Sequence, residues 1–166
     1  MTGRVHFQEE QYFQRQIESL FSKQKSNLRS FLPYADIRHV GSTAVPGMIT
    51  KGDLDIQVRV AEKDFEAAKK ILDALYDRNE GSPTTEHFIS FKDDSIKPPL
   101  GIQLTVKDSE FDIFWKITEV LKESESWRSA YNELKQTFEG HDMEEYRKAK
   151  SDFLQRLMQT SLFQAK

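Results

Sequence analysis

Two aspartates separated by one residue, Asp53 and Asp55, are the pattern best suited to chemistry in this chain. Residues 54–60 alternate between apolar and polar types, as a strand with one face in the core does, and side chains two apart on a strand point to the same face. Two neighbouring carboxylates repel each other unless a cation joins them. Mg²⁺ prefers such hard oxygen ligands and usually completes its shell with water and substrate phosphates. We therefore predict that Asp53 and Asp55 hold Mg²⁺ or Mn²⁺ against a nucleoside triphosphate.

A glycine–serine turn precedes this strand. Gly41 would let a phosphate approach the backbone closely, and Ser42 and Thr43 offer hydroxyl donors and an N-cap for a short helix whose free N–H groups favour an anion. The segment lacks the Gly-Lys-Ser/Thr ending of a Walker loop, which argues against that class of kinase or ATPase. An isolated Asp-x-Asp is most often part of an exposed strand face, but the nearby turn favours a joint metal and phosphate site.

Regular patterns on both sides predict the elements that position these residues. The apolar spacing predicts helices over 8–32 and 61–78, and three more helical segments after residue 108. Strands are expected over 37–40, 54–60, 87–92 and 101–107. The order of elements predicts an α/β (α+β) fold in which helices flank a mixed sheet of at least four strands and a helical C-terminal region packs on it.

The segment from His39 to Gly47 reads His-Val-Gly-Ser-Thr-Ala-Val-Pro-Gly and leads through Lys51 to the Asp-Leu-Asp strand. This string resembles the signature of the GrpB family, a branch of the polymerase-beta-like nucleotidyltransferases. The resemblance extends over roughly residues 34–153, because two late motifs also match: Tyr131-Asn-Glu-Leu-Lys135, and Tyr146-Arg-Lys-Ala-Lys150 followed by Phe153.

The resemblance implies a nucleotidyltransferase-like fold in which Asp53 and Asp55 are catalytic and metal-binding. Gly41, Ser42 and Thr43 would contact the nucleotide phosphates, and Lys51 and Lys150 would neutralise them. His39 is either a site residue or a structural hydrogen-bonding group. Tyr131 and Tyr146 are expected to be core residues with polar tips.

Two positions depart from the family pattern. Gly52 stands where proline is expected, and Gln103 stands where the family tends to have histidine. Members of this superfamily usually need a third carboxylate on a neighbouring strand as metal ligand or general base. The strand over 101–107 supplies none before its end, and the acids near it fall at strand ends or in loops: Glu86, Asp93, Asp94 and Asp108.

Composition limits the remaining possibilities. The 166 residues fit a single domain, 1–166, with the C-terminal helices from about residue 109 packed on the sheet. With Lys+Arg 24 against Asp+Glu 27, no non-specific nucleic-acid binding is expected. The absence of cysteine excludes disulfides and thiolate chemistry, and no apolar stretch approaches the roughly 18 residues of a membrane span, so we expect a cytoplasmic protein.

Three functions remain. The first is metal-dependent transfer of a nucleotidyl group from a nucleoside triphosphate to an unknown acceptor. The second is a weak or inactive nucleotide- or phosphate-binding accessory module, related to domains fused to a coenzyme A biosynthetic kinase. The third, a protein-interaction role for the helical C-terminal third, would leave the Gly-Ser and Asp-x-Asp motifs without a purpose.

Overall fold

A five-stranded mixed sheet is the centre of the computed structural model, which describes residues 3–9 and 14–166. The strand order is β2-β4-β7-β6-β5, with β4 and β7 parallel and the other pairs antiparallel. The strands are β2 (Asp36–Val40), β4 (Leu54–Val60), β5 (Asp77–Arg78), β6 (Phe88–Asp93) and β7 (Leu100–Val106). All four predicted strands are present, and the predicted fold class is confirmed.

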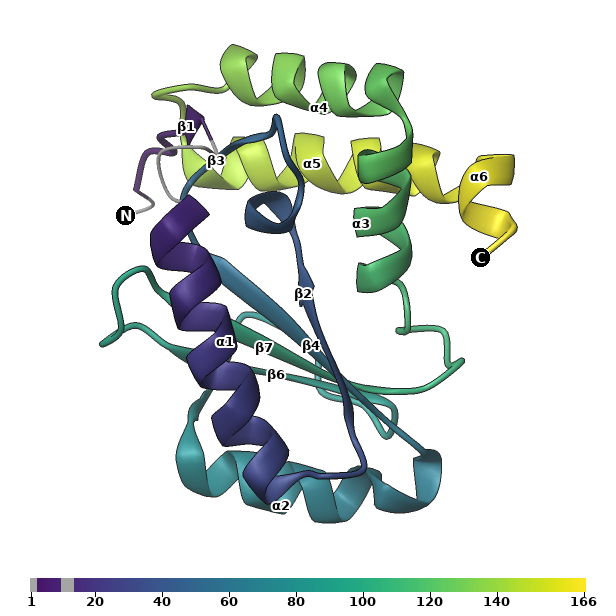
Figure 1. The fold of residues 1–166 in the computed structure, drawn as a ribbon. Helices are drawn as coiled ribbons and strands as arrows, with labels where there is room; N and C mark the ends of the chain where they lie inside the picture. Colours follow the sequence, from purple (N-terminus) through teal and green to yellow (C-terminus); the bar gives the residue numbers. More distant parts are fainter. Residues whose placement is uncertain (1–2, 10–13) are drawn as a thin grey trace.

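One face of the sheet is apolar and packs against two helices, α1 (Gln14–Phe31) and α2 (Phe65–Leu75), as Figure 1 shows. A short 3₁₀ turn, η3 (Glu62–Asp64), leads into α2. The helix expected over 8–32 is shorter, because Gln8 and Glu9 form strand β1 (Gln8–Glu9). Tyr12 and Phe13, two residues of the predicted apolar stripe, lie outside the described residues. Strand β1 pairs with β3 (Ile49–Thr50) in a separate two-stranded sheet.

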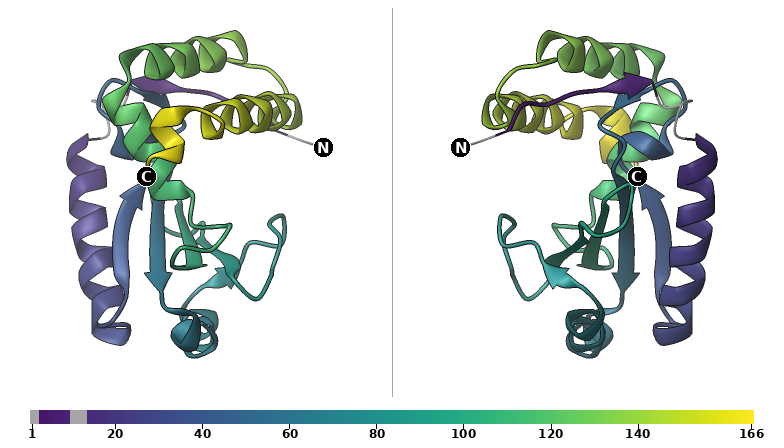
Figure 2. Two further views of the ribbon diagram at one scale, coloured as in Figure 1. Left: turned by 90° about the vertical axis from the view of Figure 1, so that its right-hand side faces the viewer. Right: turned by 90° about the vertical axis from the view of Figure 1, so that its left-hand side faces the viewer.

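The C-terminal helices lie on the side of the opposite face (Figure 2). They are α3 (Phe114–Glu123), α4 (Glu125–Thr137), α5 (Met143–Met158) and α6 (Ser161–Gln164). Helices α4 and α5 lie together beyond one end of the sheet, and α3 runs from the sheet toward them (Figures 1 and 2). Their apolar side chains form a second core, distinct from the one beneath α1 and α2.

A buried polar network fixes the start of α3 on the sheet. Asp112, which is 0 % exposed, accepts two hydrogen bonds from Arg59, at 2.8 and 2.7 Å, and one from Gln57, at 2.9 Å. Gln57 in turn accepts a bond from the backbone N–H of Trp115 at 2.9 Å. Gln57 and Arg59 of β4 are therefore buried as well, although the alternation predicted a strand with only one face in the core.

No helix in the described parts of the chain has both the length and the apolar character needed to cross a membrane.

Candidate functional site

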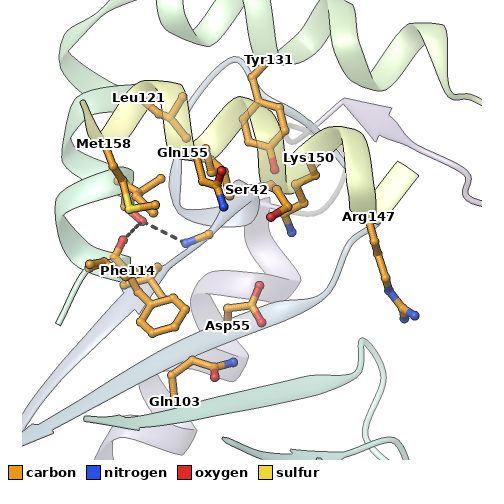
Figure 3. A pocket seen from close by; sticks show the side chains of 17 residues that line it. Ser42, Asp55, Gln103, Phe114, Leu121, Tyr131, Arg147, Lys150, Gln155 and Met158 are labelled. Atoms are coloured by element: carbon orange, nitrogen blue, oxygen red, sulfur yellow. Dashed lines mark hydrogen bonds between the residues drawn. The ribbon is translucent and has the colours of Figure 1, made fainter. Parts of the chain in front are cut away.

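A cavity of about 460 Å³ lies between the polar face of the sheet and the C-terminal helices. Its floor is formed by Val40 at the end of β2, Asp55 on β4 and Gln103 on β7, and the turn Gly41–Ser42 forms one wall. Helices α3 and α5 supply most of the remaining lining. In Figure 3, Asp55 and Gln103 lie on the strands below, and Lys150 and Arg147 project from α5 above them.

Asp55 is held between two glycines. A Cβ atom at Gly41 would lie 2.7 Å from Asp55 Oδ2, and one at Gly101 would lie 2.8 Å from Asp55 Oδ1. Both distances are shorter than side-chain carbon atoms tolerate, so this carboxylate position requires glycine on both sides. Gly41 also has φ of 82°, a conformation that favours glycine. We predicted Gly41 from its approach to a phosphate, and the structure adds its close approach to Asp55.

Burial raises the pKa of the Asp55 carboxyl to about 6, because the ionised form loses hydration inside the cavity. Lys150 opposes this shift, and the like charge of Asp53 adds to it. At neutral pH the Asp55 carboxyl is therefore an anion that the nearby lysines compensate only in part. Binding of a cation to Asp55 would relieve that penalty.

Asp53 precedes β4 and is not among the residues that line the cavity. Its Oδ2 lies 3.6 Å from Lys51 Nζ, and its side chain is 39 % exposed. Burial is also the main cause that lowers the pKa of Lys51. Asp53 and Lys51 thus form an ion pair beside the cavity, close enough for Asp53 to influence Asp55 electrostatically.

The turn after β2 is a 3₁₀ helix, η2 (Ser42–Ala44). Its N-cap is Gly41, which makes no side-chain capping bond, so the predicted capping role of Ser42 or Thr43 is wrong. A helix of three residues has no developed N-terminal dipole, so the turn could bind an anion only through individual groups such as the Ser42 hydroxyl. Thr118 on α3 accepts a hydrogen bond from the Gly41 N–H at 3.1 Å, which ties the turn to α3.

His39 and Thr43 lie away from the cavity lining. His39 pairs in register with Ile56, whereas Val40 pairs with Asp55, so His39 and Asp55 point to opposite faces of the sheet. The His39 ring stacks on Phe21 with centroids 5.1 Å apart, and its Nε2 lies 2.9 Å from Thr43 Oγ1. The Thr43 hydroxyl donates to the Asp53 carbonyl at 3.1 Å, so His39 Nε2–H is the donor to Thr43.

This chain of bonds holds the two ends of the loop between β2 and β4 together. Burial lowers the pKa of His39 to about 4, with a further contribution from Lys122. The His39 ring is therefore uncharged at neutral pH, and its single N–H proton is on Nε2, where it is donated to Thr43. Of the two roles left open by the sequence, the contacts correspond to the structural one.

Two cationic side chains of α5 line the cavity, Lys150 and Arg147. Arg147 makes an ion pair with Glu144, with Nη1 and Oε1 2.6 Å apart. Lys150 makes no hydrogen bond and no ion pair within 4.0 Å among residues 3–9 and 14–166, and Asp55 is the acid that its charge influences. Lys150 is thus placed where the sequence predicted a phosphate-binding cation.

The most buried cation of the site is Lys135 on α4, which is 1 % exposed. Its Nζ donates to Ser42 Oγ at 2.9 Å and to the Ile49 carbonyl at 2.8 Å. The neighbouring Asn132 also binds the same loop, donating to the Gly47 carbonyl at 2.8 Å and accepting from the Ile49 N–H at 2.9 Å. Helix α4 therefore fixes the loop that carries the Gly-Ser turn.

No third carboxylate joins Asp53 and Asp55 in the described residues, where no group of three or more histidines and acids could hold a metal. Asp93 accepts two bonds from Ser95, and Asp94 pairs with Lys92 at 3.0 Å. Neither Glu86 nor Asp108 lines the cavity. Gln103 forms part of the floor of the cavity near Asp55, and its side chain is a neutral amide and not a third carboxylate.

The donor set fits a divalent cation only in part. Asp55 supplies one half-buried carboxylate with a penalty that a cation relieves, and Asp53 supplies a second one, whose side chain is 39 % exposed. Mg²⁺ bound by one or two carboxylates takes its other ligands from water and phosphate. A cation here would thus depend on a phosphate ligand for much of its coordination.

The cavity changes character along α5. Arg147, Lys150 and Ser151 line it near the start of the helix, and Leu154 and Met158 line it near the end. Helix α3 adds more apolar side chains, including Phe114 and Ile117. With a rise of 1.5 Å per residue, this face of α5 spans roughly 16 Å. The cavity is therefore charged at one end and apolar at the other.

Several of these residues were not predicted as site residues. Lys135 and Lys150 were both considered as residues of the cleft wall, and Lys150 was preferred. Arg147 shares a helical face with Lys150 through its spacing of three, which was a usable signal. Gly101 and the apolar lining from α3 carried no local signal, because the approach of Asp55 and of the helices is a long-range event.

Comparison with known proteins identifies the family of this chain. The GrpB protein family model matches residues 11–160. The UPF0157 protein VC_A0354 of Vibrio cholerae serotype O1 is 30% identical over 154 residues, which cover 93% of this chain and 82% of that protein.

A solved structure has a similar fold. The conserved protein GrpB from Enterococcus faecalis aligns with a TM-score of 0.58 and 19% identity over 72% of this chain and 75% of that one. A more distant similarity, with a TM-score of 0.44 and 10% identity, covers 74% of this chain and 43% of the Cid1 poly(U) polymerase, solved with Mg and 3'-dATP bound. The match over most of the sequence establishes that the chain belongs to the GrpB family.

Proposed function

We propose that this protein binds a magnesium–nucleoside triphosphate in the cavity beneath α5 and transfers its nucleotidyl group to an acceptor hydroxyl. The observation that carries the proposal is the buried Asp55 carboxylate, which faces Lys150 beside the Gly41–Ser42 turn. This arrangement combines a carboxylate for a metal with the Lys150 ammonium and the Ser42 hydroxyl for phosphates.

The charges around the cavity support a polyanionic ligand. Three lysines, Lys51, Lys135 and Lys150, interact electrostatically with Asp55, and Asp53 is the second acid of this group. The three lysines outnumber the two acids, which favours phosphate over a metal ion bound alone. A metal bound at Asp55 would add further positive charge and would offset the charge on the phosphates.

The two-ended cavity supports a nucleotide over free polyphosphate. The phosphates would lie against Ser42, Lys150 and Arg147, and the nucleoside would lie between the apolar side chains of α3 and α5. A cavity of about 460 Å³ is within the range for one small-molecule ligand. Apolar surface at the far end would then increase affinity for the nucleoside part.

In the reaction, the acceptor oxygen would attack the α-phosphorus in line, forming a new phosphorus–oxygen bond as the bond to the β-phosphate oxygen breaks. Pyrophosphate leaves, and the acceptor proton passes to solvent or to a base. Bound Mg²⁺ would stabilise the charge on the phosphates. The protein's own part is to hold the phosphates at Ser42 and Lys150 and the metal at Asp55.

A second candidate is a binding module that holds the same ligand without turnover. It is favoured by Gln103 and by the lack of a third carboxylate near Asp55 within the described residues. A neutral amide cannot accept the acceptor proton as a general base does. Measurement of binding and of product release separately distinguishes the two candidates.

The first test is a thermal unfolding assay with each of the four nucleoside triphosphates, with and without Mg²⁺ or Mn²⁺. We expect at least one triphosphate to raise Tm in the presence of metal, and by more than tripolyphosphate does, because a ligand that binds only the folded state stabilises it. The Asp53→Asn, Asp55→Asn double variant should lose the metal-dependent shift.

The matched control is the Asp77→Asn, Asp152→Asn double variant, which removes two exposed acids that do not line the cavity. It should keep the wild-type shift. Release of pyrophosphate in the presence of an acceptor supports the transferase, and binding without release supports the module. If no triphosphate changes Tm under any condition, both candidates are wrong.

A further inference from the structure

Lys135 is buried without an acid against it. Its Nζ donates to Ser42 Oγ and to the Ile49 carbonyl, lies 4.2 Å from the centroid of the Tyr131 ring, and forms no ion pair within 4.0 Å in the described residues. Burial, with nearby Lys150 and Lys51, holds the pKa of Lys135 well below its usual value. An anion bound nearby would favour the charged form of this lysine and offset the cost of burying it.

The contact with Lys135 determines what the Ser42 hydroxyl can do. Lys135 Nζ donates in this bond, so Ser42 Oγ is the acceptor. Among residues 3–9 and 14–166, Ser42 Oγ has no second hydrogen-bond partner, and Ser42 lines the cavity. The Ser42 O–H is therefore left as a donor for a ligand in the cavity.

Lys150 is a second donor near Ser42. It has no hydrogen-bond or ion-pair partner within residues 3–9 and 14–166, and its side chain extends from α5 toward the space between Ser42 and Asp55 in Figure 3. A hydroxyl donor and an ammonium that face the same space form an anion site, because phosphate oxygens accept several hydrogen bonds at once.

We propose that Lys135 is a positioning residue: by donating to Ser42 Oγ it directs the Ser42 hydroxyl into the cavity as a donor to a polyphosphate anion. The inference rests on the proposed function, since it assigns the phosphate end of the same cavity. It adds that the anion site is assembled by α4 and that phosphate binds there without a metal.

The test is a double-mutant cycle on tripolyphosphate affinity, measured by calorimetry in EDTA. We expect Lys135→Met and Ser42→Ala each to weaken binding about tenfold, as the loss of a hydrogen bond to a charged group does. Because Lys135 acts through Ser42, the double variant should bind tripolyphosphate with the same affinity as the single variant that has the lower affinity. Independent effects would multiply instead, and that result would overturn the inference.

Asn132→Ala is the matched control, because Asn132 lies on the same helix and binds the same loop but does not contact Ser42. Its effect should be the same in the wild-type and Ser42→Ala backgrounds. A general loosening of the loop would instead give both Asn132→Ala and Lys135→Met the same coupling to Ser42→Ala. That outcome would reduce Lys135 to a structural role.

A second measurement covers the case in which Lys135→Met does not fold. The chain has no cysteine, so Ser42→Cys introduces a single thiol beside Lys135. Tripolyphosphate should slow alkylation of this thiol by iodoacetamide at least about fivefold, and the rate–pH profile should shift to lower pH than for an exposed thiol, because an adjacent cation favours the thiolate. Absence of both effects would contradict the inference.

The results also distinguish this inference from the proposed function. Metal-free binding with a coupled cycle, but no pyrophosphate release and no metal-dependent nucleotide binding, would support the anion site and refute the nucleotidyl transfer. Magnesium–nucleotide binding without any metal-free tripolyphosphate binding would refute the anion site and leave the proposed function intact.

Discussion

Replacing Asp55 with asparagine should stabilise the ligand-free protein at neutral pH, although it removes the principal candidate metal ligand. Asparagine has nearly the same shape and fits the same space between Gly41 and Gly101. It carries no charge, so it does not lose hydration as the buried carboxylate does. Stability and ligand binding should therefore change in opposite directions.

The size of the effect follows from the pKa of Asp55, which burial raises from 3.8 to about 6. The folded state thus binds more protons than the unfolded state between these two values, and stability falls as pH rises through this range. A shift of about 2 pKa units corresponds to about 3 kcal/mol at pH 7 and to almost nothing below pH 4. Lys150, Lys51 and Lys135 lower the pKa of Asp55, so burial raises it despite these favourable charges.

The assay is urea unfolding of the wild type and Asp55→Asn between pH 4 and 8 without metal or nucleotide. The variant should equal the wild type near pH 4 and exceed it by up to about 3 kcal/mol at pH 7, which corresponds to roughly 6–12 °C in Tm for a chain of this size. Asp152→Asn, at an exposed position on α5, should show no such pH-dependent gain.

Magnesium and the nucleotide should then reverse the order, because they stabilise only the wild type. A variant that is less stable than the wild type at pH 7, or a difference that does not change with pH, would refute the reasoning about Asp55. It would mean that the charges around the cavity already compensate the carboxylate.

Two further substitutions test the architecture of the site. Gly101→Ala would place a Cβ atom 2.8 Å from Asp55 Oδ1, so it should lower the free energy of unfolding in urea by about 1–3 kcal/mol and weaken metal-dependent binding. In the control Gly81→Ala the new Cβ atom would lie 3.5 Å from its nearest neighbour, so stability should hardly change. Equal effects of the two substitutions would contradict the close approach of Gly101 to Asp55. His39 has its pKa lowered to about 4, so the unfolded state binds more protons below pH 6.5 and stability should fall by up to about 3 kcal/mol as pH drops from 6.5 to 4. His39→Gln should flatten this acid limb and His141→Gln should not; an unchanged limb in His39→Gln would contradict a buried, neutral His39.

The sequence predicted the elements with strong local patterns. The alternation over Leu54–Val60 gave β4 with its correct bounds, since the period of a strand is written into consecutive residues. The beginning of α1 was placed too early, because an apolar residue spacing continues past the point where the chain pairs as a strand. The Gly-Ser turn and Asp55 were also found from local pattern, supported by the family resemblance.

Only the tertiary structure decided how these groups are used. Lys135 reaches Ser42 from 93 residues along the chain, and Gly101 meets Asp55 through the parallel pairing of β7 with β4. Residue periodicity tells which side chains share a face, but it does not tell what covers that face or which distant helix supplies its partners. The amino-acid pattern thus determined the family, the sheet and the acid on β4, whereas long-range packing set the burial of that acid, turned His39 away and brought a buried lysine to the turn.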